Sequence, residues 1–484
     1  MSHVEHFPLM LAGSNKRNDH QIEVTSPYDD HLIATVETSE MQDVDVALET
    51  AQSLFSDREK WIPVAERIAI LERAVALMEE QSDSLAKGSA EEGGKPLLDS
   101  QVEMIRCIDS IRLCADTLRH DVAKPVPMAI NTASQHRFTM MNKEPIGVVV
   151  AVSAFNHPLN LIVHQVGPSI AAGCPIIIKP SLDTPISCYE LIKLFLKSGL
   201  PEEFCQMVNI KNHLITQKLV SDERISFFSF IGSSKVGWKL KSILPPGAKS
   251  AMEHGGVGSV IIDKDTNLKK ILPLILRGAF YHAGQVCVSI QKIIVHDELM
   301  DEFIDLIKKE TIKIKVGDPR NIKTDVGPLI RPSEVKRIDK IVKKSVKEGA
   351  ELVCGGKAKN KTTYECTVIK NPKEDSEIST HEIFGPVLCV YSYNNIDNAI
   401  NKANNDKYAF QASVFTKNID TAMLCYEKID AKSVFINEQT AFRVDWMPFG
   451  GIKHSGEGEG GIEYSFSDLL YDKLMIINSD KITF

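Results

Sequence analysis

The chain has 484 residues, a net charge of −8 at pH 7, 43% hydrophobic residues and 25% charged residues. This length is too great for one hydrophobic core, so we expect two large domains or more. The composition is ordinary for a folded globular protein, and the acidic balance argues against nucleic acid as the main partner.

The cysteines and the apolar segments bear on the cellular compartment. The ten cysteines are scattered, without a CxxC pair or a Cys/His cluster that has zinc spacing. We find no secretory signal, so the pattern indicates reduced thiols and a cytoplasmic protein. The longest apolar stretches, such as residues 146–155, are far shorter than the ~20 residues that a membrane span needs. The sequence therefore predicts no membrane partner and no metal site.

The first segments of the chain predict short strands followed by helices. Strand-like residues at 22–24 and 32–36 flank a turn cluster. Apolar residues then recur at helical spacing. We expect a helix that begins at residue 41 and further helices over residues 64–81 and 97–119.

Two strand-like segments stand outside the α/β pattern. Residues 124–143 contain Pro125 and Pro127 and alternate in character from Arg137 onward. The segment KLMIIN at residues 473–478 is strand-like as well. The residues alone predict two strands that lie apart from the main sheets.

A βαβ unit follows the first of these segments. Residues 146–152 form a buried strand by composition, and residues 176–179 form the next strand. Between them we expect a helix that starts at Asn156, holds Pro158 in its first turn and continues to Ala172. Two strands joined by one helix in this way should be parallel.

A later strand-to-helix junction is a candidate anion site. After a helix over residues 185–200, we expect a strand at 227–231, a turn at Gly232 and Ser233, and a helix to residue 243. Backbone N–H groups and the dipole of a helix N-terminus favour an anion at such a turn. The full GxGxxG pattern is absent, so the junction alone does not specify a dinucleotide.

From residue 259 strands and helices alternate again, which predicts a second α/β domain. The expected strands are residues 260–262, 290–295, 351–354, 387–393, 412–415 and 433–437. The expected helices are residues 272–281, 299–311, 333–349 and 396–404. A glycine-rich loop at 450–461 then returns the chain across the site.

Three residues in separate motifs carry the parts of a covalent mechanism. Cys287 lies in YHAGQVCVSIQ, Glu253 opens EHGGVGS and Asn156 lies in AFNHP. A thiol can attack a carbonyl carbon, a carboxylate can take a proton, and a side-chain amide can donate to an oxyanion. The motifs EIFGP and PFGGIKHSG follow downstream. In order and spacing these motifs resemble the aldehyde dehydrogenase superfamily over nearly the whole chain.

This resemblance implies an α/β, aldehyde dehydrogenase-like fold of two Rossmann-like three-layer domains plus a β-hairpin oligomerisation arm. The NAD(P)-binding domain would comprise residues 1–122 and 145–254, and the catalytic domain residues 255–455. The arm would comprise residues 123–144 and 465–484. The arm implies a homodimer or a homotetramer.

The resemblance also implies the catalytic roles. Cys287 would form a thiohemiacetal whose oxyanion accepts hydrogen bonds from Asn156 and from the Cys287 backbone N–H. A thioester would follow, and Glu253 would activate the water that hydrolyses it. Relatives that transfer the acyl group to coenzyme A generally lack this glutamate, so its presence favours release of a free acid.

Cofactor binding is implied for seven residues, and FIGSSKVG resembles the family's FTGSxxVG. These residues are Lys179, Ser181, Gly232, Ser233, Val236, Glu382 and Phe384. Lys179 matches the lysine that holds the adenosine ribose. Leu182 stands where strictly NAD-dependent relatives carry a glutamate that repels a 2′-phosphate, so either NAD or NADP is expected.

The substrate pocket departs from the common family pattern. His157 and His164 replace a phenylalanine and a tryptophan of many relatives. With Arg106 and Arg443 these histidines would form an anion clamp, and Phe449, like Trp446, would line the same pocket as packing. The alternative is that the arginines pair with Asp99, Glu103 or Asp445.

We therefore predict NAD(P)-dependent oxidation of a small polar or anionic aldehyde, such as phosphonoacetaldehyde, to its acid. FRVDWMPFGG and QVCVS most resemble the lactaldehyde and phosphonoacetaldehyde dehydrogenase branch. The apolar Val286 beside Cys287 weakens the phosphonate interpretation. The alternatives are a lactaldehyde, glycolaldehyde or other semialdehyde dehydrogenase, and a non-catalytic structural or binding protein on the same scaffold.

Overall fold

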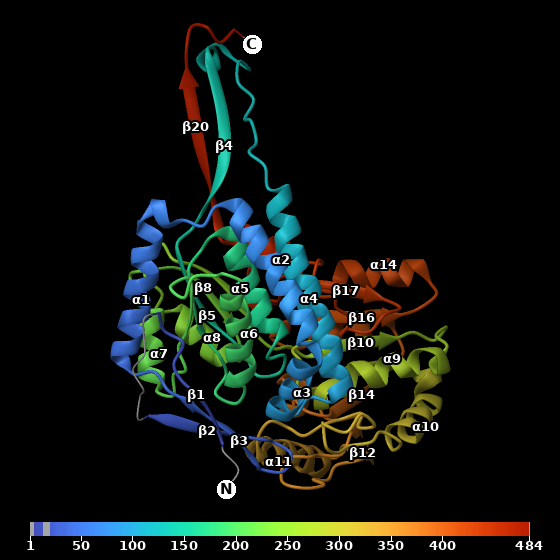
Figure 1. Cartoon of the computed structure of the whole chain (residues 1–484). Helices are drawn as coiled ribbons and strands as arrows, with labels where there is room; N and C mark the ends of the chain where they lie inside the picture. Colours follow the sequence, from blue (N-terminus) through green and yellow to red (C-terminus); the bar gives the residue numbers. More distant parts are fainter. Residues whose placement is uncertain (1–3, 13–19, 484) are drawn as a thin grey trace.

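Two mainly parallel sheets, each covered by helices, form the body of the chain in this computed structural model (Figure 1). The structure describes residues 4–12 and 20–483. One sheet has six strands in the order β19-β9-β8-β5-β6-β7, and the other has seven in the order β12-β13-β14-β11-β10-β16-β17. The two α/β units expected from the alternating pattern are both present.

The first sheet forms around β5 (Val148–Val152), whose five residues are all buried. β5 is parallel to both of its neighbours, as the βαβ pattern predicts. The other strands are β6 (Ile176–Lys179), β7 (Cys205–Met207), β8 (Ile225–Ile231), β9 (Lys249–Glu253) and β19 (Gly456–Glu457). The helices between them are α5 (Asn160–Ala172), α6 (Pro185–Lys197), α7 (His213–Val220) and α8 (Ser234–Lys241).

Alternate residues of β5 enter two hydrophobic clusters, because successive side chains of a strand point to opposite faces. Val149 and Ala151 pack on the face covered by α2, α4, α5 and α6, whereas Val148 and Val150 pack with α1 and α7. The helices of this unit that lie outside the β5–β9 segment are α1 (Met41–Ser56), α2 (Val64–Glu80), α3 (Ser82–Gly93), α4 (Leu97–His120) and α15 (Ile462–Asp468).

In the second sheet, the connection between β10 and β11 contains the segment that ends at Cys287. Its strands are β10 (Gly258–Ile262), β11 (Ile290–His296), β12 (Glu351–Cys354), β13 (Thr367–Lys370), β14 (Val387–Tyr393), β16 (Gln411–Phe415) and β17 (Ser433–Ile436). Its helices are α9 (Leu268–Phe280), α10 (Met300–Thr311), α11 (Pro332–Lys347), α12 (Glu377–Thr380), α13 (Ile396–Ala403) and α14 (Ile419–Lys428). Strand β13 was not expected from the sequence.

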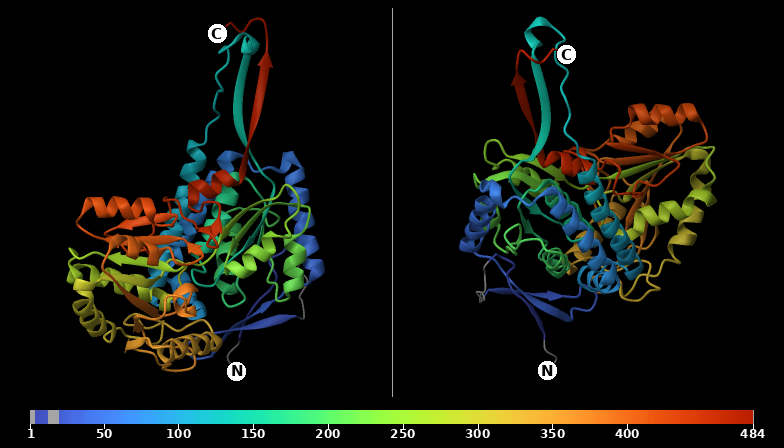
Figure 2. Two further views of the ribbon diagram at one scale, coloured as in Figure 1. Left: turned by 180° about the vertical axis from the view of Figure 1, so that it is seen from behind. Right: turned by 45° about the horizontal axis from the view of Figure 1, so that its top comes forward.

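One short sheet pairs β15 (Tyr408–Ala409) with β18 (Ile452–Lys453), and two further small sheets lie outside the two units. Strands β1 (Glu5–Phe7), β3 (Leu32–Glu37) and β2 (Gln21–Thr25) form one, and β4 (Arg137–Pro145) pairs with β20 (Leu470–Asn478) in the other. The β4–β20 ribbon is antiparallel and projects from the body (Figures 1 and 2). Residues 462–468 instead form α15 against α4 and α5, so the projecting strand starts later than the expected residue 465. The expected outer limits at residues 1 and 484 lie outside the described residues.

The helix expected to start at Asn156 begins at Asn160 instead. The backbone N–H groups of Leu159 and Asn160 both donate to Oε1 of Glu103, at 3.0 and 2.9 Å. A carboxylate that takes the first free N–H groups of a helix fixes where the helix begins. Pro158 therefore precedes the helix, and the turn at Asn156 is left open toward the cavity described below.

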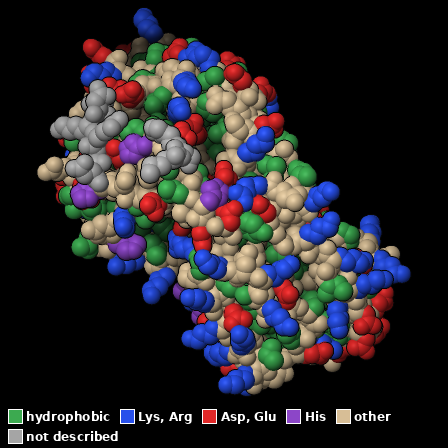
Figure 3. Space-filling model, turned by 60° about the horizontal axis from the view of Figure 1, so that its bottom comes forward, with side chains coloured by type: hydrophobic (Ala, Val, Ile, Leu, Met, Phe, Trp, Pro, Cys, Tyr) green, Lys and Arg blue, Asp and Glu red, His purple; other side chains and the backbone are tan. Residues whose placement is uncertain are grey.

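No helix among the described residues is long and apolar enough to cross a bilayer. On the face of the molecule shown in Figure 3, basic and acidic side chains are interspersed. The charge of this face is therefore mixed rather than of one sign.

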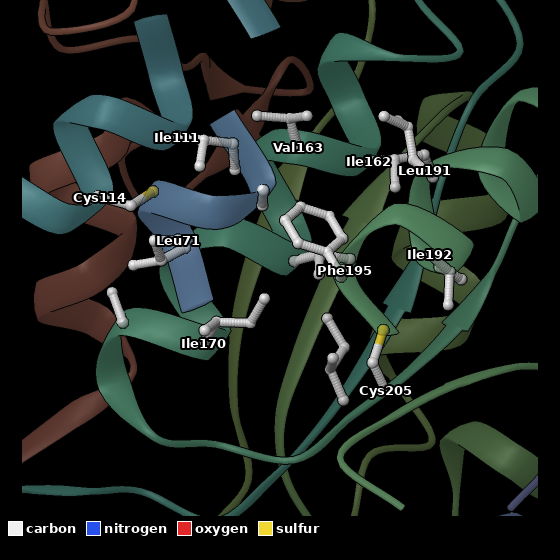
Figure 4. Packing of buried hydrophobic residues seen from close by; sticks show 14 of the residues in the cluster. Leu71, Ile111, Cys114, Ile162, Val163, Ile170, Leu191, Ile192, Phe195 and Cys205 are labelled. Atoms are coloured by element: carbon white, nitrogen blue, oxygen red, sulfur yellow. The ribbon is translucent and has the colours of Figure 1, made fainter. Parts of the chain in front are cut away.

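The packing of α2, α4, α5 and α6 on the first sheet is dense around Phe195. Its ring lies among Leu71, Ile170 and Leu191 (Figure 4), and it is fully buried. Aromatic side chains in such positions contribute much of the stability of a core.

We predict that Phe195→Ala lowers the free energy of unfolding by about 3–5 kcal/mol, because it removes buried area and leaves a cavity. Chemical denaturation followed by circular dichroism measures the change. Lys197→Ala on the same helix is exposed and should change stability by under about 0.5 kcal/mol. Equal effects of the two variants would contradict the packing described here.

Candidate active site

The carboxyl ends of β5, β6, β8 and β9 open on one cavity of about 620 Å³. Ligands of parallel α/β sheets bind beyond the carboxyl ends of the strands. The opposite wall comes from the second unit, through residues 285–288, Glu382 and Phe384, and Ala441, Arg443 and Phe449. With the exception of Trp446, every site residue expected from the sequence lines this cavity. They are Arg106, Asn156, His157, His164, Lys179, Ser181, Gly232, Ser233, Val236, Glu253, Cys287, Glu382, Phe384, Arg443 and Phe449.

Cys287 and Asn156 are held together by backbone contacts. Nδ2 of Asn156 donates to the carbonyl oxygen of Gln285 at 2.9 Å, which leaves its second N–H free. Gln285 itself is buried and its side chain donates to His282 O and Pro328 O. The sequence motif contained Gln285 but gave no sign that its side chain anchors the loop.

The loop before Cys287 makes a left-handed turn. His282, Ala283 and Gly284 have φ angles of 47°, 55° and 69°. A Cβ atom at Gly284 would lie 2.1 Å from the carbonyl oxygen of Gly385, so only glycine fits at this close approach. The segment that carries Cys287 is thereby packed against the segment that carries Glu382.

Burial shifts the pKa values of the three acidic groups in the cavity. It raises the pKa of the Cys287 thiol well above its usual range, and the charges of Glu253 and Glu382 add to this shift. Burial also raises the pKa of Glu253 to about 7, against the opposing charge of Arg443. The pKa of Glu382 rises to about 7 as well, and its Oε1 accepts from the Gly256 N–H at 3.2 Å. A carboxylate with a pKa near neutrality suits general-base catalysis.

The residues expected at the cofactor fit a dinucleotide in two respects. Burial lowers the pKa of Lys179 to about 8, and its Nζ donates only to the neighbouring Pro180 O among the described residues. Gly232 and Ser233 lie between β8 and α8, and a Cβ atom at Gly232 would meet the Phe230 ring at 2.9 Å. A cationic side chain and a bare backbone turn at a helix N-terminus match the phosphate and ribose groups of such a ligand.

His254 supports this turn. Its Nδ1 lies 3.3 Å from the carbonyl oxygen of Gly232, and its ring packs against Trp238. A Cβ atom at Gly237 would lie 2.0 Å from this ring, so α8 approaches His254 closely. His254 therefore positions the start of α8 next to Glu253.

The charged residues at the other end of the cavity meet at Asp445. Arg106 binds it through two hydrogen bonds, Nε to Oδ2 at 3.0 Å and Nη2 to Oδ1 at 2.6 Å. His164 Nε2 lies 2.8 Å from Oδ1, and Arg443 Nε lies 3.9 Å from it. Hydrogen bonds from His164 and Arg106 hold the pKa of Asp445 below its usual value although burial opposes this. Arg106 is thus paired with an acidic neighbour, as the alternative interpretation had it.

Arg443 is less fully paired than Arg106. Its Nη1 donates to Met447 O at 3.1 Å, and its guanidinium lies 4.0 Å from the centre of the Phe449 ring. Burial lowers the pKa of Arg443 to about 10, so the group stays charged at neutral pH. The expectation that Trp446 lines the pocket is wrong, because Trp446 is 61% exposed and does not line the cavity. The neighbouring Asp445 turns inward instead to meet Arg106 and His164.

Neither histidine adds positive charge here. Burial lowers the pKa of His164, even though the hydrogen bond to Asp445 opposes the shift. Burial lowers the pKa of His157 well below its usual value, and the positive charges of Lys95 and Arg106 act in the same direction. Within the described residues, no group of three or more metal-binding side chains comes together.

Comparison with known proteins agrees with this geometry. The model of the aldehyde dehydrogenase family matches residues 14–475. The chain belongs to this family. Its fold is the aldehyde dehydrogenase α/β fold, and the protein is an NAD(P)-dependent aldehyde dehydrogenase.

Three similar proteins illustrate the range of substrates. A 3-sulfolactaldehyde dehydrogenase from Priestia megaterium is 32% identical, with 99% of each chain covered. The structure of aldehyde dehydrogenase 21 from Physcomitrella patens, in complex with the product succinate, is 30% identical with a TM-score of 0.94 and covers 99% of each chain. Glyceraldehyde-3-phosphate dehydrogenase GapN from Methanocaldococcus jannaschii, complexed with NADP, is 31% identical with a TM-score of 0.91. It matches over 96% of this chain and 100% of that one.

The carboxylate of Glu253 lies directly against Gly460. A Cβ atom at Gly460 would lie 2.4 Å from Glu253 Oε1, so any larger residue must displace the carboxylate.

We predict that Gly460→Ala lowers kcat by about tenfold to a hundredfold, since a displacement of about 1 Å at a reacting group has such an effect. Steady-state aldehyde oxidation measures the change, and thermal melting shows whether the fold is kept. Gly88→Ala in α3 has no atom within 4 Å of the new Cβ and serves as the control. A Gly460→Ala enzyme with full activity would mean that Glu253 is not needed where the structure has it.

Proposed function

We propose that this aldehyde dehydrogenase oxidises a small anionic aldehyde to its free carboxylic acid. The observation that carries the proposal is an excess of positive charge at one end of the cavity. Arg106 and Arg443 have one carboxylate, Asp445, within ion-pair distance, and both histidines are neutral. Glu253 is the other carboxyl group that acts on Arg443, and with a pKa of about 7 it offsets only part of the remaining positive charge. An anionic substrate group would balance the rest in this buried site.

Arg443 is the residue that we assign to the substrate anion. Arg106 already gives two hydrogen bonds to Asp445, whereas Arg443 has only a backbone carbonyl and a distant carboxylate oxygen as polar partners among the described residues. Phe449 supports its guanidinium from one face. The relatives named above act on a sulfonated aldehyde and a phosphorylated aldehyde or bind a dicarboxylate product, which supports an anionic substrate.

In the proposed reaction Cys287 is the nucleophile. Its thiolate attacks the aldehyde carbon, and the oxyanion accepts hydrogen bonds from the free N–H of Asn156 and from the Cys287 backbone N–H. Each such donor contributes about 3 kcal/mol to the transition state. When bound, NAD or NADP supplies a positively charged nicotinamide that favours the thiolate and accepts the hydride.

Glu253 completes the cycle by releasing the acid. It accepts a proton from water, the hydroxide adds to the thioester carbon, and the bond to the Cys287 sulfur breaks to give the carboxylic acid and the thiolate. With a pKa of about 7, the Glu253 carboxylate is basic enough to accept this proton at neutral pH.

Binding of either NAD or NADP is supported by the adenosine end of the cavity. We assign Lys179 and Ser181 to the ribose there, with Gly232, Ser233 and Val236 along the phosphates. Leu182 also lines the cavity and brings no charge to repel a 2′-phosphate. We assign Glu382 and Phe384 to the nicotinamide end of the cofactor.

A second candidate is oxidation of an uncharged hydroxyaldehyde of the lactaldehyde or glycolaldehyde kind. The full pairing of Arg106 with Asp445 favours it, because half of the expected clamp is already occupied. A non-catalytic role for the scaffold would require that Cys287 be dispensable.

We also propose that the β4–β20 ribbon joins this chain to a second copy in a homodimer or homotetramer. An isolated two-stranded ribbon is at best marginally stable in water. Its strand β20 exposes Leu474, Met475, Ile476 and Ile477 by 44–58% of their surface. Pairing with another subunit would cover these side chains.

A cytoplasmic location is supported by the cysteines. All ten are free thiols, and Cys287 and Cys354 are the two that are partly buried rather than fully buried. A reducing compartment would keep the reactive thiol of Cys287 available for catalysis.

We predict that kcat falls below pH 7, because Glu253 must be deprotonated to accept a proton and its pKa is about 7. The pH profile of steady-state turnover measures this. Glu253→Gln should lose about a hundredfold or more in kcat and should lose this limb of the profile, whereas Cys287→Ala should form no reduced cofactor. A Glu253→Gln enzyme with an unchanged profile would exclude Glu253 as the base.

We predict that anionic aldehydes exceed propanal in kcat/KM by at least tenfold, with NAD or with NADP. The panel contains propanal, lactaldehyde, succinate semialdehyde, phosphonoacetaldehyde, 3-sulfolactaldehyde and glyceraldehyde 3-phosphate. Arg443→Met should lower kcat/KM for the anionic members by about 10–100-fold, as expected for loss of a charged hydrogen bond. Arg112→Met on α4 is half-exposed and serves as the matched control. Equal values for propanal and the anionic aldehydes would overturn the proposal.

A further inference from the structure

His157 lies beside the oxyanion residue and has one ring nitrogen to offer a ligand. It follows Asn156 in the turn between β5 and α5, and both residues line the cavity. Nε2 of His157 lies 3.3 Å from the hydroxyl oxygen of Tyr281. The ring has no other hydrogen-bond partner among the described residues. Nδ1 is not one of the fully buried side-chain atoms that lack a hydrogen-bond partner, so this nitrogen is exposed to the cavity.

His157 is neutral, which decides what it can bind. Burial and the charges of Lys95 and Arg106 lower its pKa well below the usual value. A neutral imidazole has one donor nitrogen and one acceptor nitrogen. If the Tyr281 hydroxyl donates to Nε2, Nδ1 carries the proton and donates into the cavity. If Nε2 donates to Tyr281, Nδ1 is an acceptor there.

A hydroxyl group is the ligand that fits both cases, since it donates and accepts hydrogen bonds. A carboxylate, sulfonate or phosphate dianion only accepts, and an alkyl carbon does neither. Asn156 donates to the oxygen on the aldehyde carbon in the proposed mechanism. His157 is the next residue and lines the same cavity, so a hydroxyl on the carbon that adjoins the aldehyde is the substrate group that we assign to its ring.

We propose that Nδ1 of His157 binds a hydroxyl group on the carbon next to the aldehyde, so that the enzyme prefers 2-hydroxyaldehydes. This inference rests on the proposed function and adds a second recognition point to it. Arg443 would hold the anionic end of the substrate and His157 the hydroxyl between that end and the aldehyde. Sulfolactaldehyde and glyceraldehyde 3-phosphate carry such a hydroxyl, and succinate semialdehyde does not.

A substrate without the hydroxyl would leave Nδ1 without a hydrogen bond from the substrate. A site that hydrogen-bonds a substrate hydroxyl rejects the analogue without it far more strongly than an apolar pocket rejects a missing methylene group. We expect at least a tenfold preference in kcat/KM.

The test compares two matched pairs of aldehydes that differ only in this hydroxyl. Lactaldehyde is compared with propanal, and glyceraldehyde 3-phosphate with 3-phosphooxypropanal. For the wild-type enzyme each ratio of kcat/KM should be ten or more. His157→Phe should bring both ratios close to one, and His157→Gln, which keeps a polar group, should restore part of the preference. Tyr281→Phe should lower the ratios, because it removes the hydrogen bond that orients the His157 ring.

Arg443→Met separates this inference from the anion proposal. It should lower kcat/KM for both phosphorylated aldehydes and leave the hydroxyl ratio within about threefold of the wild-type value. The lactaldehyde and propanal pair contains no anion, so its ratio tests His157 even if the anion proposal fails. Thermal melting of each variant shows whether it folds.

Two results would overturn the inference. One is a wild-type ratio near one for both pairs. The other is a high ratio that folded His157→Phe and His157→Gln enzymes both keep in full, because the hydroxyl would then be bound by another group.

Discussion

The loop that carries Asn156 and His157 depends on one buried carboxylate, Glu103. One oxygen of Glu103 accepts two backbone N–H groups at the start of α5, and the other pairs with Lys95. Both side chains of the ion pair are completely buried. A buried carboxylate is tolerated only when its hydrogen-bonding capacity is filled, so α4, α5 and the loop between β5 and α5 have one mutually consistent arrangement.

Helix α4 extends this arrangement to the second unit. Asp99 pairs with Arg277 on α9, and Arg106 pairs with Asp445 on the loop after β17. Successive turns of one helix thus hold the oxyanion loop, the helix that leads to Cys287 and the loop of Arg443. The substrate end of the cavity is built from both units, and its charge balance is set on α4 as much as on the residues that face the substrate.

The sequence predicted the local features of this structure well and its long-range contacts poorly. Apolar runs and turn residues located β5, β6, β8 and β11 to within two residues at either end, because burial and strand geometry are local in the sequence. The start of α5 was wrong because Glu103, more than fifty residues earlier, decides it. The role of Arg106 was undecided for the same reason, since its partner Asp445 is 339 positions away. The inward turn of Asp445 and the outward turn of Trp446 depend on that same pairing, which no pattern around these residues reveals.

The contact between Gly284 and Gly385 brings two backbones together with no side chain between them. Variation in the rest of the cavity wall can accumulate without touching this contact. Substitutions at His157, Leu182 or Arg443 can therefore alter which substrate or cofactor binds, while the distance between the thiol and the nicotinamide pocket stays constant. A scaffold of this kind would diversify in what it oxidises long before it diversified in how it oxidises.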